Sequence, residues 1–343
     1  MPGLRTLALT VTMRGGARWE GETRSGWSHL LEHLVFKGAG EMGARDIVER
    51  IEAEGGTINA ATGYERTNFE VRALDGSLGL AMQVVSDLVF RPTLDPAEIE
   101  REKDVVAQEI AEAFDTPDDH VFEMAQTRAF SGQPLGRPIL GSIASLKPVT
   151  RESIGDWRAR LYSPDRMVVA VSGAVDEAEL LALAERWFGQ AVATPVETPE
   201  LAVFTGGAST LSRRIEQANL VFQLPSVSAT DPALPAMRLF TEILGGGMAS
   251  RLFQSAREER GLAYAIDAYQ EAYVTSACWG STPAPPPIAR SNWPRSAPTR
   301  FAAWPTTARP TPSCRGPRLC SRRGSGCRTK ARPAGRGGSR PRP

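Results

Sequence analysis

The amino-acid sequence predicts an α+β protein made of two related domains, the second of them truncated. Strand-like and helix-like patterns alternate along residues 6–188. After a segment whose composition is typical of a linker, at 189–207, a similar order begins again and stops early. We therefore expect a first domain at 1–188 and an incomplete second domain at 208–276.

The strands of the first domain are predicted from short apolar runs that alternate with polar residues. In the clearest of them, Phe69, Val71 and Ala73 point to one side of the strand. The predicted strands lie at 6–11, 57–61, 67–74 and 167–172.

Helices are predicted where apolar residues recur every three to four positions and capping residues mark the ends. Gly38 is expected to end the first helix in the left-handed conformation. Asp95 followed by Pro96 is expected to begin the longest one. The predicted helices lie at 25–37, 44–54, 77–90, 95–114, 118–130, 150–162 and 176–188.

The second domain repeats this alternation with fewer elements. A glycine turn at 245–247 separates its two predicted helices. The helices are expected at 232–244 and 250–259, and the strands at 210–215, 219–223, 262–269 and near Tyr273.

The formal net charge of +1 hides two oppositely charged parts. Residues 272–343 contain fourteen basic and no acidic residues, thirteen of the 26 prolines and all four cysteines. The rest of the chain sets 26 basic residues against 39 acidic ones, a net charge of −13. We interpret 277–343 as a disordered Pro/Arg-rich tail produced by a frameshift in a GC-rich gene.

A nucleic-acid or membrane arm is the alternative interpretation of this tail. It lacks interleaved aromatic residues and helical periodicity, so no nucleic-acid and no membrane partner is predicted. Residues 1–271, the body of the chain, have no cysteine, no convincing signal peptide and no apolar run long enough to span a membrane. These absences lead us to expect a cytoplasmic protein.

Two of the three histidines stand in the pentapeptide His29-Leu30-Leu31-Glu32-His33. On a helix, positions i and i+4 share one face about 5–6 Å apart, so both imidazoles can bind one ion. Glu32 lies one turn after His29, where it can take a proton from a metal-activated water. H-x-x-E-H is the inverted form of the zinc-peptidase helix motif. The alternative is an amphipathic helix with a solvated glutamate.

A catalytic zinc site needs a third protein ligand and an open position for water. Glu102 and Glu109 are seven residues apart on the predicted long helix, so they share a face with a drift of only about 20°. The glutamates of that helix, all of them candidates for the third ligand, are Glu98, Glu100, Glu102, Glu109 and Glu112.

With these residues the sequence resembles the pitrilysin/insulinase-type zinc metallopeptidases, most closely the bacterial members that are similar to mitochondrial processing peptidase. Glu109 stands 76 residues after His33, the spacing at which this family carries its glutamate ligand. The resemblance implies that His29, His33 and Glu109 bind zinc and that Glu32 is the general base. It further implies that Glu102 orients a ligand or the water, the alternative being a solvated surface charge.

Two further segments resemble the family. Asn59 and Ala60 match the edge strand to which a peptide substrate adds as an extended strand; the alternative is an ordinary strand that ends in a turn. Arg257 and Tyr264 match an arginine and a tyrosine seven residues later that contact substrate carbonyls. Without the resemblance, Arg257 would be interpreted as a helix-surface charge and Tyr264 as a core residue.

The resemblance implies two domains, each a mostly antiparallel sheet with helices on one face, around a closed chamber, and a first strand that precedes Met1. It implies a zinc-dependent metalloendopeptidase that acts on unfolded peptides or presequence-like segments. The alternative is a catalytically inactive subunit that binds peptides or scaffolds a complex. Peptides are the expected partners, basic ones in view of the −13 body, and pairing as a homodimer or a heterodimer is left open.

Overall fold

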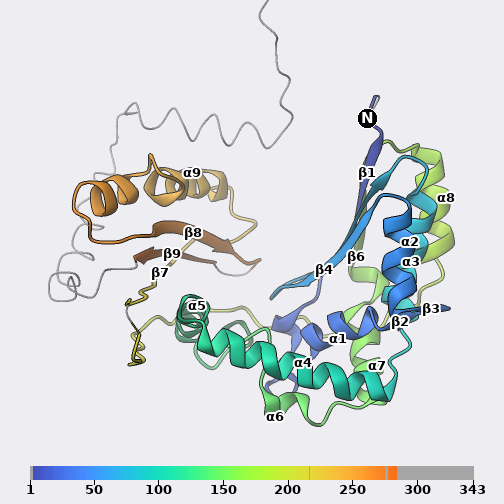
Figure 1. The fold of residues 1–343 in the computed structure, drawn as a ribbon, viewed down its shortest axis with the longest axis horizontal. Helices are drawn as coiled ribbons and strands as arrows, with labels where there is room; N and C mark the ends of the chain where they lie inside the picture. Colours follow the sequence, from blue (N-terminus) through green and yellow to red (C-terminus); the bar gives the residue numbers. More distant parts are fainter. Residues whose placement is uncertain (1–2, 216, 275–276, 284–343) are drawn as a thin grey trace, which may run out of the picture. The chain divides into compact units, whose positions relative to one another are not determined.

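A computed structural model describes residues 3–215, 217–274 and 277–283 (Figure 1). By its contacts the chain divides into two compact units. The first consists of 1–215, 219–231 and 270–280, and the second of 216–218, 232–269 and 281–343. These bounds differ from the domain limits that the sequence predicts, and the predicted limits stay a prediction.

The first unit is built on a four-stranded sheet in which every neighbouring pair is antiparallel. Alternate residues of β1 from Leu7 to Met13 are buried, whereas those between them are exposed or half-buried. The sheet therefore packs one face on the core, which confirms the predicted α+β class. The strand order is β4 (Thr57–Thr62), β5 (Thr67–Leu74), β1 (Thr6–Met13) and β6 (Met167–Gly173).

Helices cover the buried face of this sheet, and α1 packs against β4, α4 and α7 (Figure 1). The described helices include none that is both long and apolar enough to cross a membrane. The α-helices of the first unit are α1 (Trp27–Val35), α2 (Ala44–Ala53), α3 (Leu78–Phe90), α4 (Pro96–Asp115), α5 (Pro117–Ala129), α6 (Ile143–Leu146), α7 (Arg151–Leu161) and α8 (Glu177–Phe188).

The predicted elements of the first unit are confirmed to within a few residues, with one correction at the end of α1. Asp95 caps α4 through bonds from the N–H groups of Ala97 and Glu98, as predicted. The prediction that Gly38 ends the first helix is wrong. That helix ends at Val35, and Gly38 begins a small hairpin of β2 (Gly38–Ala39) and β3 (Met42–Gly43).

In the second half the predicted elements are less well placed. The described segment 210–215 forms no strand; the side chain of Arg213 lies over the ring of Phe114 and donates a hydrogen bond to the Phe114 carbonyl. The helix expected at 250–259 is largely a π-helical turn at Phe253–Glu258. The remaining elements are α9 (Leu234–Gly245) and a sheet of order β7 (Phe222–Pro225), β9 (Ala277–Pro283) and β8 (Ile266–Ala272).

Strand β9 also corrects the predicted tail. The sequence predicts disorder from residue 277 onward. Ala277–Pro283 instead form a strand, whose backbone pairs with its neighbours in the sheet. The rest of the predicted tail, 284–343, lies outside the described residues, and the frameshift stays a prediction.

The start of α1 is held by a carboxylate from outside the helix. The residue at the helix N-cap is Gly26, which has φ +89° and no side chain to cap the first turn. Glu20 takes that role: its Oε2 accepts from the N–H of Gly26 and its Oε1 from that of Ser28, each at 2.7 Å. Burial raises the pKa of Glu20 to about 7, although both bonds and Arg137 oppose the shift.

This buried carboxyl should make the stability of the protein depend on pH. The pKa of Glu20 is higher in the folded protein than the ordinary value of 4.5, so its contribution is full below pH 4.5 and falls as the pH rises to about 7. We expect the free energy of unfolding of the wild type, relative to Glu20→Gln, to fall by about 3 kcal/mol between pH 4.5 and 8. Urea unfolding at a series of pH values measures this difference.

Glu22→Gln is the matched control, because Glu22 is a neighbouring carboxylate that is exposed. Its free energy of unfolding should follow that of the wild type at every pH. A difference between wild type and Glu20→Gln that is constant, or that grows with pH, contradicts the prediction.

Candidate metal centre

Helix α1 presents two imidazoles on one face. His29 and His33 are one turn apart, and their ring centroids lie 4.7 Å from each other. Both side chains are mostly buried, and the apolar face of the same helix, with Leu30, Leu31 and Leu34, packs into the core. The amphipathic pattern of α1 therefore directs the two rings away from the core side.

Helix α4 brings Glu109 to both imidazoles. The Nε2 atom of His29 lies 3.8 Å from Oε2 of Glu109, and Nε2 of His33 lies 3.6 Å from Oε1. One ligand atom from each of the three residues lies within 4.8 Å of the others. The structure thus brings together the three residues that the family resemblance implies as ligands.

Glu102 contacts the other side of His33. Its Oε2 lies 3.1 Å from Nδ1 of His33, and its Oε1 pairs with the ammonium group of Lys37 at 2.9 Å. A paired carboxylate only accepts hydrogen bonds, so Nδ1 of His33 donates to Glu102, and Nε2 is the ring nitrogen that faces Glu109. No sequence motif indicates Lys37, although its position four residues after His33 places it on the same side of α1.

Glu32 lies between the two histidines in the sequence. Its Oε2 is buried and has no hydrogen-bond partner among the described residues. The buried phenol of Tyr162, whose pKa is raised first by burial and then by the charge of Glu32, is close enough to sense that charge. Tyr162 is a further neighbour of the site that no sequence pattern indicates.

The donor set fits a zinc ion. Nδ1 of His29 and Oε2 of Glu109 are also buried polar atoms without a hydrogen-bond partner among the described residues. The 3.6 and 3.8 Å separations are too long for hydrogen bonds, but they are close to the edge of about 3.3 Å expected between ligands of a tetrahedral zinc site. Burial, with the neighbouring His33, lowers the pKa of His29 to about 4, so its imidazole is neutral, as a metal ligand must be.

The predicted substrate residues Asn59 and Ala60 lie on β4, at one edge of the sheet and in contact with α1. Ala60 pairs with Phe69 of β5 and its side chain is buried, whereas Asn59 is exposed. The side chain of Ala60 thus belongs to the core, and only its backbone could contact a ligand. The role of both residues stays a prediction.

Arg257 and Tyr264 lie in the second unit. The guanidinium of Arg257 lies 5.0 Å from the ring centroid of Tyr264 and 4.6 Å from that of Phe253. Tyr264 is 75% exposed, so the alternative interpretation as a core residue is wrong. The structure brings these two residues to each other, and their contact with a substrate stays a prediction.

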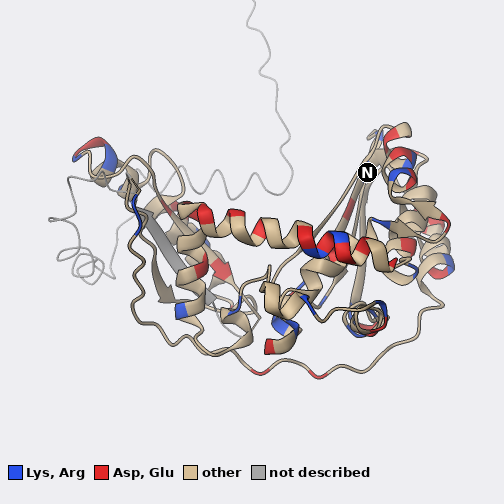
Figure 2. Ribbon diagram, turned by 60° about the horizontal axis from the view of Figure 1, so that its bottom comes forward, with Lys and Arg blue, Asp and Glu red and all other residues tan. Residues whose placement is uncertain are grey.

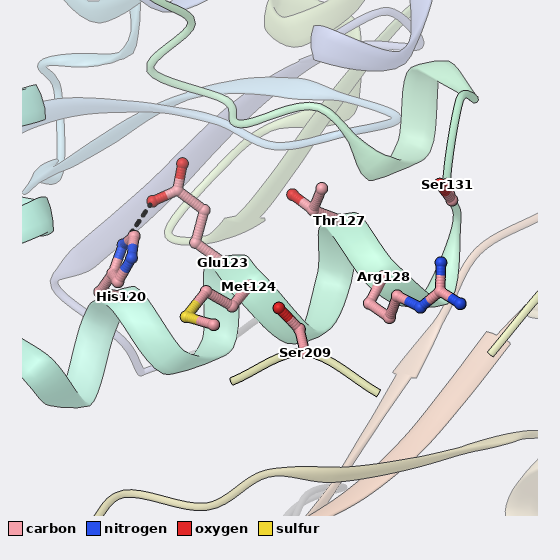
Figure 3. Close-up of a pocket in the computed structure, with 7 residues that line it drawn as sticks. All are labelled: His120, Glu123, Met124, Thr127, Arg128, Ser131 and Ser209. Carbon is pink, nitrogen blue, oxygen red and sulfur yellow. Dashed lines mark ion pairs between the residues drawn. The ribbon is translucent and has the colours of Figure 1, made fainter. Parts of the chain in front are cut away.

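The third histidine, His120, lies in a different place. It lines a cavity of about 220 Å³ beside α5, with Met124, Thr127 and Arg128 (Figure 3). Its Nδ1 lies 3.6 Å from Glu123, and its ring packs edge-on against that of Phe114. Among the described residues, only His29, His33 and Glu109 form a group with the spacing of metal ligands, and His120 is not part of it.

Comparison with known proteins identifies the family. The family model described as Insulinase (Peptidase family M16) matches residues 2–143, and the one described as Peptidase M16 inactive domain matches 148–281. The chain belongs to the M16 (insulinase) peptidase family. Its candidate zinc ligands and Glu32 all lie in the first of the two matched segments, and the second contains no histidine.

Proteins from several bacteria that are similar to this chain carry the name "uncharacterized zinc protease". The one from Mycobacterium leprae is 36% identical over 272 residues, which cover 78% of this chain and 61% of that protein. The one from Bacillus subtilis is 34% identical over 279 residues, 80% of this chain and 67% of that protein. The chain thus spans roughly two thirds or less of the length of these curated relatives.

Two solved structures share the fold. A protease from Helicobacter pylori aligns with a TM-score of 0.76 at 18% identity, over 84% of this chain and 71% of that one. A peptidase M16 inactive domain from Pseudomonas fluorescens aligns with a TM-score of 0.87 at 17% identity, over 95% and 80%. The M16 assignment is confirmed, and the particular closeness to mitochondrial processing peptidase stays a prediction.

Zinc binding by the three ligands can be measured through stability. Zinc at a free concentration 100 times its dissociation constant should raise the free energy of unfolding of the wild type by about 2.7 kcal/mol. His33→Ala should lose this increase because it removes one of the three ligands. His120→Ala, which changes the histidine of the separate cavity, should keep it. An equal increase for wild type and His33→Ala would show that zinc binds elsewhere.

Proposed function

We propose that the chain is a zinc-dependent metalloendopeptidase that hydrolyses peptide bonds in unfolded or extended segments. The observation that supports it most is the convergence of His29, His33 and Glu109 on the face of α1 that also carries Glu32. Independent support comes from the relatives, which carry the name zinc protease. We propose one zinc ion in the first domain and none in the second, where no histidine is available.

Each side chain has a distinct part in this proposal. A bound zinc ion would lower the pKa of a water and polarise the scissile carbonyl. The carboxylate of Glu32 would take the proton of the attacking water and return it to the leaving amine nitrogen, so no covalent intermediate forms. Glu102 keeps the proton of His33 on Nδ1 and leaves Nε2 free to bind the metal.

The substrate would bind along β4. This strand is paired on one side only within its four-stranded sheet, so its other edge can accept an extended peptide through the backbone of Asn59 and Ala60. Arg257 and Tyr264 would contact substrate carbonyls. A cytoplasmic location and assembly into a homodimer or a heterodimer remain part of the proposal.

Glu32→Gln separates this function from that of an inactive, peptide-binding subunit. The substitution removes the base but none of the ligands, so we expect kcat to fall by at least about 100-fold while the zinc content is unchanged. Chelator-sensitive hydrolysis of an unfolded peptide, together with metal analysis, measures both. Glu100→Gln, which changes an exposed glutamate on α4, should match the wild type. Zinc-loaded wild type that binds but does not cleave peptides would identify the inactive subunit instead.

The charge of the body leads us to propose basic peptides as preferred substrates. Acidic residues recur along α4, where seven stand against two basic ones (Figure 2). Such a charge excess attracts cationic peptides at low ionic strength and is screened by salt. For peptides matched in length we expect faster cleavage of the basic one at low salt and a smaller difference at 0.5 M salt. Equal rates for both peptides at both salt concentrations would contradict this preference.

A further inference from the structure

The two histidines of the candidate metal centre are oriented by different means. The ring of His33 is fixed by the bond from its Nδ1 to Glu102, which Lys37 holds in turn. Nδ1 of His29 is buried and has no hydrogen-bond partner among the described residues. The direction of the His29 side chain therefore depends on its backbone, which is the first turn of α1.

That first turn lacks a cap of its own. The N-cap residue of a helix normally accepts hydrogen bonds from the first free N–H groups through a polar side chain. Here the residue is Gly26, and a Cβ at this position would lie 2.4 Å from the carbonyl oxygen of Leu140. A serine, threonine or aspartate therefore does not fit, and the acceptor has to come from another part of the chain.

Glu20 supplies this acceptor with both of its oxygens. The N–H groups of Gly26 and Ser28 each donate to a different oxygen at 2.7 Å, so the carboxylate cannot rotate without breaking one bond. The side chain is 3% exposed, so water does not compete for these bonds. Glu20 is itself held, because its backbone carbonyl accepts a hydrogen bond from Arg137.

The residue next to His29 is fixed as a result. Besides its N–H bond to Glu20, Ser28 accepts a hydrogen bond at its Oγ from the indole N–H of Trp157 at 3.3 Å. Two elements thus hold Ser28, the residue immediately before the first histidine: the loop before α1 binds its backbone N–H, and helix α7 binds its side chain.

We propose that Glu20 is a positioning residue of the metal centre: its carboxylate fixes the first turn of α1 and so directs the imidazole of His29 toward the metal. This inference rests on the proposed function. Glu20 does not touch the metal or the substrate. Both glutamates orient a histidine, but by different routes. Glu102 contacts the ring of His33, whereas Glu20 acts on His29 through the backbone of the first turn.

The test compares wild type, Glu20→Gln and the exposed control Glu22→Gln at pH 8, where the carboxyl is ionised. Zinc affinity is measured by competition with a chelator, and kcat and KM with a basic peptide. In Glu20→Gln an amide nitrogen replaces one acceptor. We expect its zinc dissociation constant to rise about 10-fold and its kcat to fall about as much, with KM unchanged. Glu22→Gln should match the wild type in all three constants.

A lower melting temperature of Glu20→Gln with an unchanged zinc affinity and kcat at 25 °C would overturn the inference, because the residue would then serve stability alone. If Glu20→Gln does not fold, Glu20→Asp is judged by the same two constants, since it keeps the charge but cannot reach both N–H groups. A wild type that neither binds zinc nor cleaves peptides refutes the proposed function, and this inference with it. An active wild type that Glu20→Gln matches refutes the inference alone.

Discussion

The candidate site depends on the packing of α1 against α4. Helix α4 carries two rows with the same seven-residue spacing: Ile99 and Val106, which are buried in the core, and Glu102 and Glu109, which meet the histidines of α1. Each glutamate follows one of these apolar residues by three positions. The apolar contact that joins the helices therefore also fixes where the two carboxylates lie along α1. The same interface therefore serves stability and metal binding.

Glu102 and Glu109 differ in how deeply their side chains are buried, and this difference gives them different roles. Glu102 is almost fully buried, and an unpaired charge there would be costly, so its pairs with Lys37 and His33 are required. Those pairs use both of its oxygens and assign the proton of His33 to Nδ1. Glu109 is 37% exposed, and its Oε2 has no hydrogen-bond partner among the described residues. A carboxylate of this kind remains available to a metal ion.

The sequence predicts the elements of the first unit and the grouping of the candidate ligands, because both follow from local periodicity and from one long-range spacing. Helical periodicity places His29 and His33 on one face, but it does not choose among the five glutamates of α4. The family spacing selects Glu109. Sequence reasoning fails where the backbone is not periodic: it places Gly38 at a helix end rather than in a hairpin, and it expects a strand at 210–215. It also expects disorder where β9 forms, because composition does not show which backbone finds a pairing partner.

Glu20 shows why some determinants of a site are hidden from sequence patterns. A helix start is normally recognised from a polar residue directly before it, but the tight approach of Gly26 to Leu140 excludes a side chain there. The capping group lies six residues upstream in a segment without periodicity. Its pKa is raised by burial, so the protein keeps a carboxyl that is costly to ionise in the core. In return, the carboxyl accepts two hydrogen bonds from the start of the helix that carries both histidines. A side chain at the N-cap position could not accept them, because only glycine fits there.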